Sequence, residues 1–237
     1  MATIAGVDAC RRGWVVVIVD EDLATCGDAD VLPDFGKVLA LVRDCAAVAV
    51  DIPIGLSEDL ARGGREVDRE ARGLLRGRVS TVFNAPPRPV LGAQSFEEAV
   101  EIAKKHSSSG IGLSRQTFGI LKRIAEVDTL MTEELQKRVF EVHPELSFRA
   151  MNGELPLARS KRSAQGVVSR IRLLESAGFG EVLECAAELA GTSASLDDVL
   201  DASAVAWTAR RHVRGEAHRI PDDPPLDRRG LRMEMWW

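Results

Sequence analysis

Two aspartates, Asp8 and Asp51, each follow an apolar run that is typical of a buried β-strand. Residues 3–7 precede Asp8, and residues 46–50, which show no polar alternation, precede Asp51. If these strands are parallel neighbours, both carboxylates emerge at one edge of the sheet, where open α/β sheets bind ligands. Two carboxylates held together repel one another and need a cation or a shared proton. The pair therefore predicts a site for Mg²⁺ or Mn²⁺, ions that prefer oxygen ligands.

Further acidic residues follow later in the chain. Asp198 and Asp201 are three residues apart in a predicted helix, so they share one helical face. Glu141 and Glu145 flank the end of another predicted strand. Carboxylates from a hairpin strand, a central strand and a late helix suit two-metal cleavage of a phosphodiester, in which one ion generates hydroxide and the other stabilises the leaving oxygen. The structural alternative is that aspartates at strand ends form turns and that Asp198, or its neighbour Asp197, caps the helix.

The order of the predicted elements places the two strands together. The strands 3–7 and 13–19 are joined so closely that they must pair antiparallel as a hairpin. A third strand is predicted at 26–32, then a helix that begins at Pro33, then the buried strand 46–50. Hairpin, strand, crossover helix and buried strand is the opening order of a ribonuclease H-like fold. By analogy with that fold, the first and fourth strands lie side by side in the centre of the sheet.

The rest of the chain is predicted to be mostly helical. We expect one α/β domain over 1–237, with a ribonuclease H-like fold, a central mixed five-stranded sheet flanked by helices, and a helical insertion at about 57–135. The later predicted helices are 66–77, 95–105, 114–127, 161–175, 181–189 and 197–214, with strands at 139–142 and 231–236. Ser114 is placed to cap the helix that follows it.

Composition limits the classes of function. The chain has 237 residues and a net charge of −5, which argues against a protein that coats nucleic acid through a basic surface. None of its four cysteines stands in a Cys-x-x-Cys pair, which argues against a zinc ribbon. We see neither a signal peptide nor a run of about 20 apolar residues, so we expect a cytoplasmic protein with no membrane partner.

A series of arginines recurs at spacings of three and four and then continues into the following loop. Its members are Arg62, Arg65, Arg69, Arg72, Arg76, Arg78 and Arg88. The last five are predicted to contact substrate, because the planar guanidinium group donates two parallel hydrogen bonds to a phosphate. The equally weighted alternative is a solvated helix face whose charges form local pairs worth about 0.2–0.5 kcal/mol each.

Other motifs exclude more than they support. His143-Pro144-Glu145 matches half of the zinc deaminase signature, but the Pro-Cys-x-x-Cys half is absent, which excludes that chemistry. His143 is predicted to help shape the acidic pocket and to bind substrate, and the pattern favours the alternative of an ordinary hydrogen-bonded histidine. The sequence contains neither a P-loop nor a Gly-x-Ser-x-Gly nucleophile elbow.

Six stretches, in order, carry a resemblance to a known family. They are GVDACRRGWVVV (6–17), VAVDIPIGL (48–56), RGRVSTVFNAPPR (76–88), GLSRQTFGILKRIAEVD (112–128), FEVHPELSF (140–148) and DDVLDASAVAWTARR (197–211). They resemble the DUF429 family, an uncharacterised group predicted to be ribonuclease H-like nucleases, through almost the whole chain. The resemblance implies catalytic roles for Asp8, Asp51, Glu145 and Asp201, and metal ligation by these four and Asp198. The acidic pattern is also similar to the Holliday-junction resolvase branch, from which the long helical middle departs.

The expected function is a divalent-metal-dependent nuclease that uses Mg²⁺ or Mn²⁺ and acts on structured DNA or RNA. One alternative is ATP-dependent phosphotransfer, since sugar kinases and actin share this fold superfamily. Those proteins carry two duplicated domains and glycine-rich phosphate loops, which this sequence lacks. The other alternative is a non-catalytic binding module. The oligomeric state is open, with a homodimer as one option.

Overall fold

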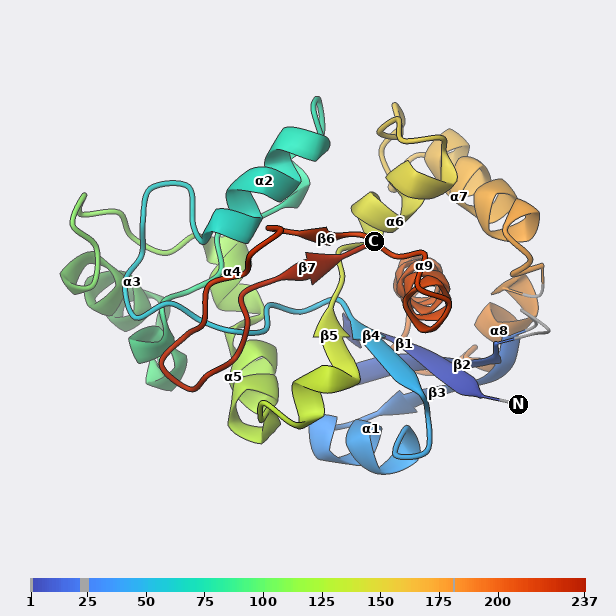
Figure 1. The fold of residues 1–237 in the computed structure, drawn as a ribbon, viewed down its shortest axis with the longest axis horizontal. Helices are drawn as coiled ribbons and strands as arrows, with labels where there is room; N and C mark the ends of the chain where they lie inside the picture. The colour runs from blue at the N-terminus through green and yellow to red at the C-terminus, as the bar shows by residue number, and fades with distance from the viewer. Residues whose placement is uncertain (1, 22–25, 181) are drawn as a thin grey trace. The chain divides into compact units, whose positions relative to one another are not determined.

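The computed structural model describes residues 2–21, 26–180 and 182–237. Its main sheet has five strands in the order β3-β2-β1-β4-β5 (Figure 1). The strands are β1 (Thr3–Cys10), β2 (Gly13–Asp20), β3 (Cys26–Leu32), β4 (Ala47–Val50) and β5 (Val139–Glu141). β1 pairs antiparallel with β2 and parallel with β4, so the predicted hairpin and the central position of the first and fourth strands are confirmed. This mixed α/β sheet is compatible with a ribonuclease H-like fold.

The chain divides into two compact units. The first comprises Met1–Ile52, Arg138–His218 and Trp236–Trp237, and it contains the five-stranded sheet. Its helices are α1 (Phe35–Leu41), α6 (Pro144–Met151), α7 (Ala164–Ser176), α8 (Val182–Glu188) and α9 (Leu196–Val213). The second unit comprises Pro53–Lys137 and Arg219–Met235, and the predicted insertion 57–135 lies within it.

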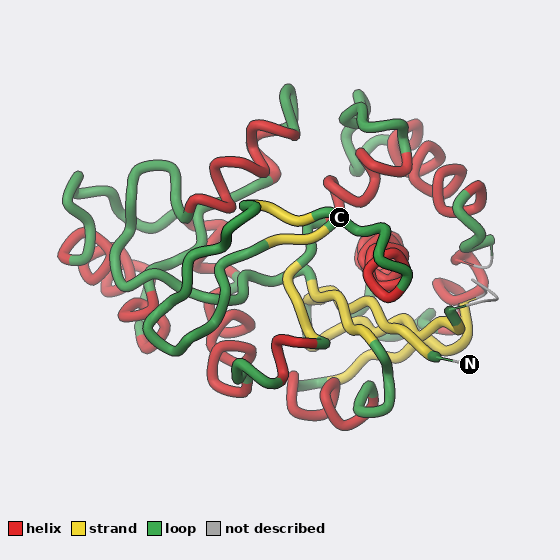
Figure 2. Tube along the Cα trace, in the orientation of Figure 1, coloured by secondary structure: helices red, strands yellow, loops and turns green. Residues whose placement is uncertain are grey.

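The second unit consists of short helices joined by long loops, as Figure 2 shows. Its elements are α2 (Glu66–Leu74), the 3₁₀ turns η1 (Val79–Thr81), η2 (Arg88–Gly92) and η3 (Leu135–Lys137), α3 (Phe96–Lys105), α4 (Arg115–Gly119) and α5 (Leu121–Leu130). Near the end of the chain, β6 (Arg219–Ile220) and β7 (Met235–Trp236) form a two-stranded sheet. Among the described residues, no helix has the length and apolar character that crossing a membrane requires.

Helices cover both faces of the main sheet, which explains the unbroken apolar run of β4. All four residues of β4 are buried, as expected for a strand covered on both faces. On one face, Ile4, Val15 and Val17 belong to the same apolar core as residues of α9. On the other face, the Trp14 ring packs against Phe35 of α1, with ring centroids 5.1 Å apart. Each fully buried aliphatic side chain stabilises such a core by about 1.5–3 kcal/mol.

Several predicted boundaries were wrong for local reasons. The helix predicted at 114–127 is two helices, α4 and α5, which meet at Ile120, and Ser114 caps the first as predicted. The helix α6 was not predicted, although Pro144 at its first turn is a known start signal. The predicted strand 231–236 is reduced to the two residues of β7, and the other short strand, β6, was not predicted.

Candidate metal centre

The pairing of β1 with β4 brings Asp8 and Asp51 together. Val7 is the register partner of Val50, and the Asp51 backbone N–H donates to the Val7 carbonyl at 2.9 Å. The residue that follows Val7 and the residue that follows Val50 are therefore both aspartates, and they lie at the carboxyl edge of the sheet. Because register partners in a sheet point to the same face, both carboxylates are directed to one side. The sequence prediction that these two residues are neighbours is confirmed.

A close approach between α9 and β1 adds Asp201 to the pair. A Cβ atom on Gly6 would lie 2.0 Å from the carbonyl oxygen of Ala202 and 2.7 Å from the Cβ of Ala206. Only glycine in the strand, facing small residues in the helix, lets the two backbones come this close. Asp201 immediately precedes Ala202 and so reaches the same sheet edge as Asp8.

The three carboxylates form one compact group. Asp8, Asp51 and Asp201 each offer an oxygen atom, and these atoms lie within 4.8 Å of one another. Asp8 and Asp201 are only 7% and 4% exposed, and Asp51 is half-buried. All the donors are carboxylate oxygens, which is the ligand set that Mg²⁺ and Mn²⁺ prefer. The donor set therefore fits a hard divalent cation.

The negative charge of the group is only partly compensated. Burial raises the pKa of Asp8 well above its usual value, and the neighbouring Asp51 and Asp201 raise it further. Burial also raises the pKa of Asp51 and of Asp201, each to about 7, although Lys161 acts against both shifts. Near neutral pH the cluster therefore binds protons that a divalent cation would displace.

Lys161 is the cation that faces the cluster. Its Nζ donates to Asp201 Oδ2 at 2.7 Å and lies 2.8 Å from Asp197 Oδ2. Burial would lower the pKa of Lys161, but the two carboxylates raise it above its usual range. No ion pair of the described residues involves Asp8 or Asp51, so one lysine serves only part of the group. Sequence reasoning missed Lys161, because it is 40 residues from Asp201 and stands in no recognisable motif.

Two predicted ligands have other partners. Glu145 pairs with Arg170 of α7, and both side chains are buried. Asp198 accepts from the Ser195 backbone N–H at 2.8 Å, while the Ser195 hydroxyl accepts from the Asp198 N–H, which makes a capping box at the start of α9. Neither residue belongs to the group of three, although Glu145 raises the pKa of Asp51 and Asp198 that of Asp8. Their ligation of a metal stays a prediction.

His143 has a structural partner in the same unit. It is the N-cap of α6, and its Nδ1 accepts a hydrogen bond from the Glu145 backbone N–H at 3.2 Å. The alternative of an ordinary hydrogen-bonded histidine therefore describes a contact that exists. Substrate binding by His143 stays a prediction.

The predicted arginine series lies in the second unit, where several members bond internally. Arg69 donates to the Gly64 carbonyl at 2.7 Å, and Arg72 donates to the carbonyls of Val82 and Gly63. Arg88 pairs with Asp128 at 2.9 Å and also with Asp227 and Glu58. Of the other two predicted contacts, Arg76 is exposed and Arg78 is partly buried. Their role as phosphate contacts stays a prediction, and these bonds give most of the series a structural role within its own unit.

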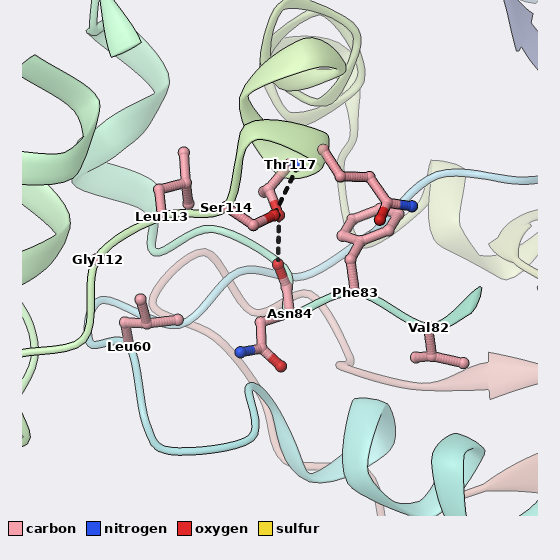
Figure 3. A pocket seen from close by; sticks show the side chains of 9 residues that line it. Leu60, Val82, Phe83, Asn84, Gly112, Leu113, Ser114 and Thr117 are labelled. Carbon is pink, nitrogen blue, oxygen red and sulfur yellow. Dashed lines mark hydrogen bonds between the residues drawn. The ribbon is translucent and has the colours of Figure 1, made fainter. Parts of the chain in front are cut away.

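A different pocket in the second unit lacks charged groups. It has a volume of about 270 Å³, and Figure 3 shows Leu60, Phe83 and Asn84 among its lining side chains. The Thr117 hydroxyl bonds to the Ser114 hydroxyl at 2.8 Å and to the Asn84 carbonyl at 3.2 Å. None of the residues that line it is acidic, basic or a histidine, so it offers neither a metal ligand nor a general base. The carboxylate cluster of the first unit, by contrast, offers oxygen ligands for a metal ion.

Comparison with known proteins gives one match. The model of a family described as "Protein of unknown function (DUF429)" matches residues 6–226, nearly the whole chain. No curated protein and no solved structure matches. The predicted resemblance to this family is confirmed, and the match covers all three aspartates of the cluster.

Proposed function

Because the chain belongs to DUF429, whose description assigns no activity, we propose from the site itself that the protein is a divalent-metal-dependent phosphodiesterase acting on nucleic acid. The observation that carries the proposal is the group formed by Asp8, Asp51 and Asp201. Its three oxygens converge at the carboxyl edge of a sheet, where α/β proteins commonly bind ligands. Raised pKa values at a partly accessible cluster are typical of functional sites.

The residues of the cluster have separable tasks in this proposal. Asp8 and Asp51 would hold Mg²⁺ or Mn²⁺, since no described residue neutralises them by an ion pair. Asp201 would be a third ligand, and Lys161 would position it through the 2.7 Å hydrogen bond to Oδ2. When bound, the metal supplies an activated water and stabilises the leaving oxygen of a phosphodiester. Glu145, held by Arg170, keeps further negative charge beside Asp51 and so favours cation binding.

Metal binding and cleavage test the proposal together. Titration calorimetry with Mn²⁺ would compare wild type with Asp8→Asn and Asp51→Asn. Cleavage would be measured with Mn²⁺ or Mg²⁺ on single strands, duplexes and four-way junctions of DNA and RNA. We expect both substitutions to weaken Mn²⁺ binding and to reduce cleavage by at least about 100-fold, since each removes a charged ligand.

Asp44→Asn is the matched control. Asp44 is also an aspartate beside β4, but its side chain is 89% exposed and it precedes the strand, at the opposite edge of the sheet. It should bind Mn²⁺ and cleave as wild type does. Equal cleavage by wild type, Asp8→Asn and Asp51→Asn, or no Mn²⁺ binding by wild type, would overturn the proposal.

A further inference from the structure

A pocket of about 460 Å³ opens beside the hairpin that joins β1 to β2. One wall consists of Arg11 and Arg12 in the hairpin turn, and the other of Gly191, Thr192 and Ser193 between α8 and α9. All of these residues belong to the first unit. A contact of 3.4 Å between Cys10 Sγ and Ser193 Oγ joins the two walls. The pocket is thus built from the same unit as the carboxylate cluster.

Both walls continue directly into the elements that carry the cluster. Arg11 follows Asp8 by three residues, which is at most about 10 Å of extended chain. Asp8 and Cys10 are two residues apart in β1, so they point to the same face of the sheet, the face covered by α9. On the other wall, the chain runs from Ser193 into the start of α9 and on to Asp201. The pocket therefore adjoins the cluster on the same face.

The charge of the pocket is available to a ligand. Arg11 and Arg12 are exposed, and their guanidinium groups make no hydrogen bond or ion pair with any residue that the structure describes. The Thr192 hydroxyl already donates to the Leu189 carbonyl at 2.7 Å, and Ser193 contacts Cys10. The two arginines are therefore the groups that would bind a ligand. A planar guanidinium group suits the paired oxygens of a phosphate.

We propose that this pocket binds a backbone phosphate of a polynucleotide, next to the phosphodiester that lies at the carboxylate cluster. This inference rests on the proposed function, because the phosphodiester at the carboxylate cluster is the one that would be cleaved. It adds a substrate class to that function. The substrate is a polymer with at least one phosphate beside the scissile one, and a lone phosphodiester does not use the pocket. Local binding of this kind suits a chain whose net charge is −5, because two arginines attract phosphate without a basic surface.

The test compares a polymer with a single phosphodiester as substrates of one enzyme. Arg11→Ala/Arg12→Ala should raise KM for an oligonucleotide at least about tenfold, since it removes both of the charged groups that would hold the adjacent phosphate. The same variant should cleave bis(p-nitrophenyl) phosphate at the wild-type rate. Arg43→Ala is the control, because Arg43 is exposed and precedes β4, at the opposite edge of the sheet. It should leave both reactions unchanged.

Binding without turnover separates this inference from the proposed function. In the Asp51→Asn background, fluorescence anisotropy would follow a labelled single-stranded oligonucleotide over a range of salt concentrations. Removing both arginines should reduce the slope of log K against log salt by about 0.7, which corresponds to the one phosphate that the pocket would bind on a single strand. Reduced binding by the double variant, with no cleavage of any substrate by wild type, would uphold the pocket and reject the phosphodiesterase. Unchanged binding and unchanged oligonucleotide KM would overturn the pocket.

Discussion

Each of the two units contains buried aspartates, and the two sets differ in what surrounds them. In the second unit, Asp227 accepts hydrogen bonds from the backbone N–H groups of Leu56, Arg229 and Leu231 and from the Arg88 guanidinium group. Burial alone would raise the pKa of Asp227, but these donors lower it below its usual value. In the first unit, burial raises the pKa of Asp8, whose carboxylate accepts the Ala9 N–H at 2.7 Å.

The difference separates a structural charge from a functional one. Where donors and a cation surround a buried carboxylate, the ionised form is stable and the group helps to hold the fold. Where three carboxylates converge with one lysine beside them, ionisation in the folded protein costs free energy until a cation binds. Such a cost is expected at a site that function maintains and stability alone would not. The following changes test the two halves of this comparison.

The largest effect on stability is expected from removing Arg88, the cation that pairs with Asp227. Arg88→Met should lower the free energy of unfolding by about 3–5 kcal/mol, because it leaves the buried side chain of Asp227 without its cation. Urea unfolding followed by far-ultraviolet circular dichroism would measure the change. Tryptophan fluorescence gives a second probe, which reports on unfolding of the first unit because all four tryptophans belong to it.

Arg43→Met is the control for that change, because Arg43 and Asp44 form an exposed pair of a kind that contributes at most about 1 kcal/mol. A loss below about 1 kcal/mol in Arg88→Met would show that the network around Asp227 is not structural.

In the carboxylate cluster of Asp8, Asp51 and Asp201, removing a charge should instead raise the free energy of unfolding. In the absence of metal, Asp8→Asn should raise the free energy of unfolding at pH 8 by about 1–3 kcal/mol, because it removes an unfavourable buried charge. At pH 4 the wild-type carboxylates are protonated in the folded protein, so the gain should be small. It should grow as pH rises above about 4, the pKa of an aspartate in the unfolded chain, because the raised pKa of Asp8 in the folded protein makes each further rise in pH favour unfolding of the wild type.

Thermal unfolding in a chelating buffer from pH 4 to pH 9 would follow this gain, and saturating Mn²⁺ should reverse its sign by stabilising only the wild type. A gain that did not depend on pH would contradict the electrostatic explanation.

The smallest effect is expected where a predicted ligand has a capping role. Asp198→Ala should cost about 1 kcal/mol of stability and change Mn²⁺ affinity by less than about threefold, because the carboxylate is held in the capping box. Ser195→Ala, which removes the other half of the box, should cost a similar amount. Calorimetry with Mn²⁺ decides between the two roles. A loss of affinity greater than tenfold in Asp198→Ala alone would make Asp198 a metal ligand, as its spacing from Asp201 suggests.

The sequence predicted the carboxylate pair correctly from local strand signals combined with analogy to a ribonuclease H-like fold, which placed the first and fourth strands side by side. A short hairpin forces antiparallel pairing, an unbroken apolar run marks a central strand, and Asp8 and Asp51 each follow the last register pair of β1 and β4, Val7 and Val50. Asp201 was expected from its helical spacing and from the family resemblance, and its place in the group is confirmed. The arginine series was harder to interpret, since its periodicity suits either substrate or internal partners. Carbonyls such as that of Val82, and carboxylates such as Asp227, bind it from distant parts of the chain.

What the sequence determined by itself is therefore the hairpin, the buried strand and the aspartate that follows the apolar run of each, and analogy with a known fold supplied the pairing that brings Asp8 and Asp51 together at one edge of the sheet. Only the tertiary structure decided which other charges reach that edge. Lys161 and Asp201 meet across 40 residues, and Glu145 meets Arg170 across 25, through helix packing that no local pattern encodes. The approach of α9 depends on Gly6 facing Ala202 and Ala206, a fit of shapes that is visible only when both backbones are in place. Local pattern fixes which way a side chain points from its strand, whereas long-range packing fixes its neighbours, and those neighbours set its charge.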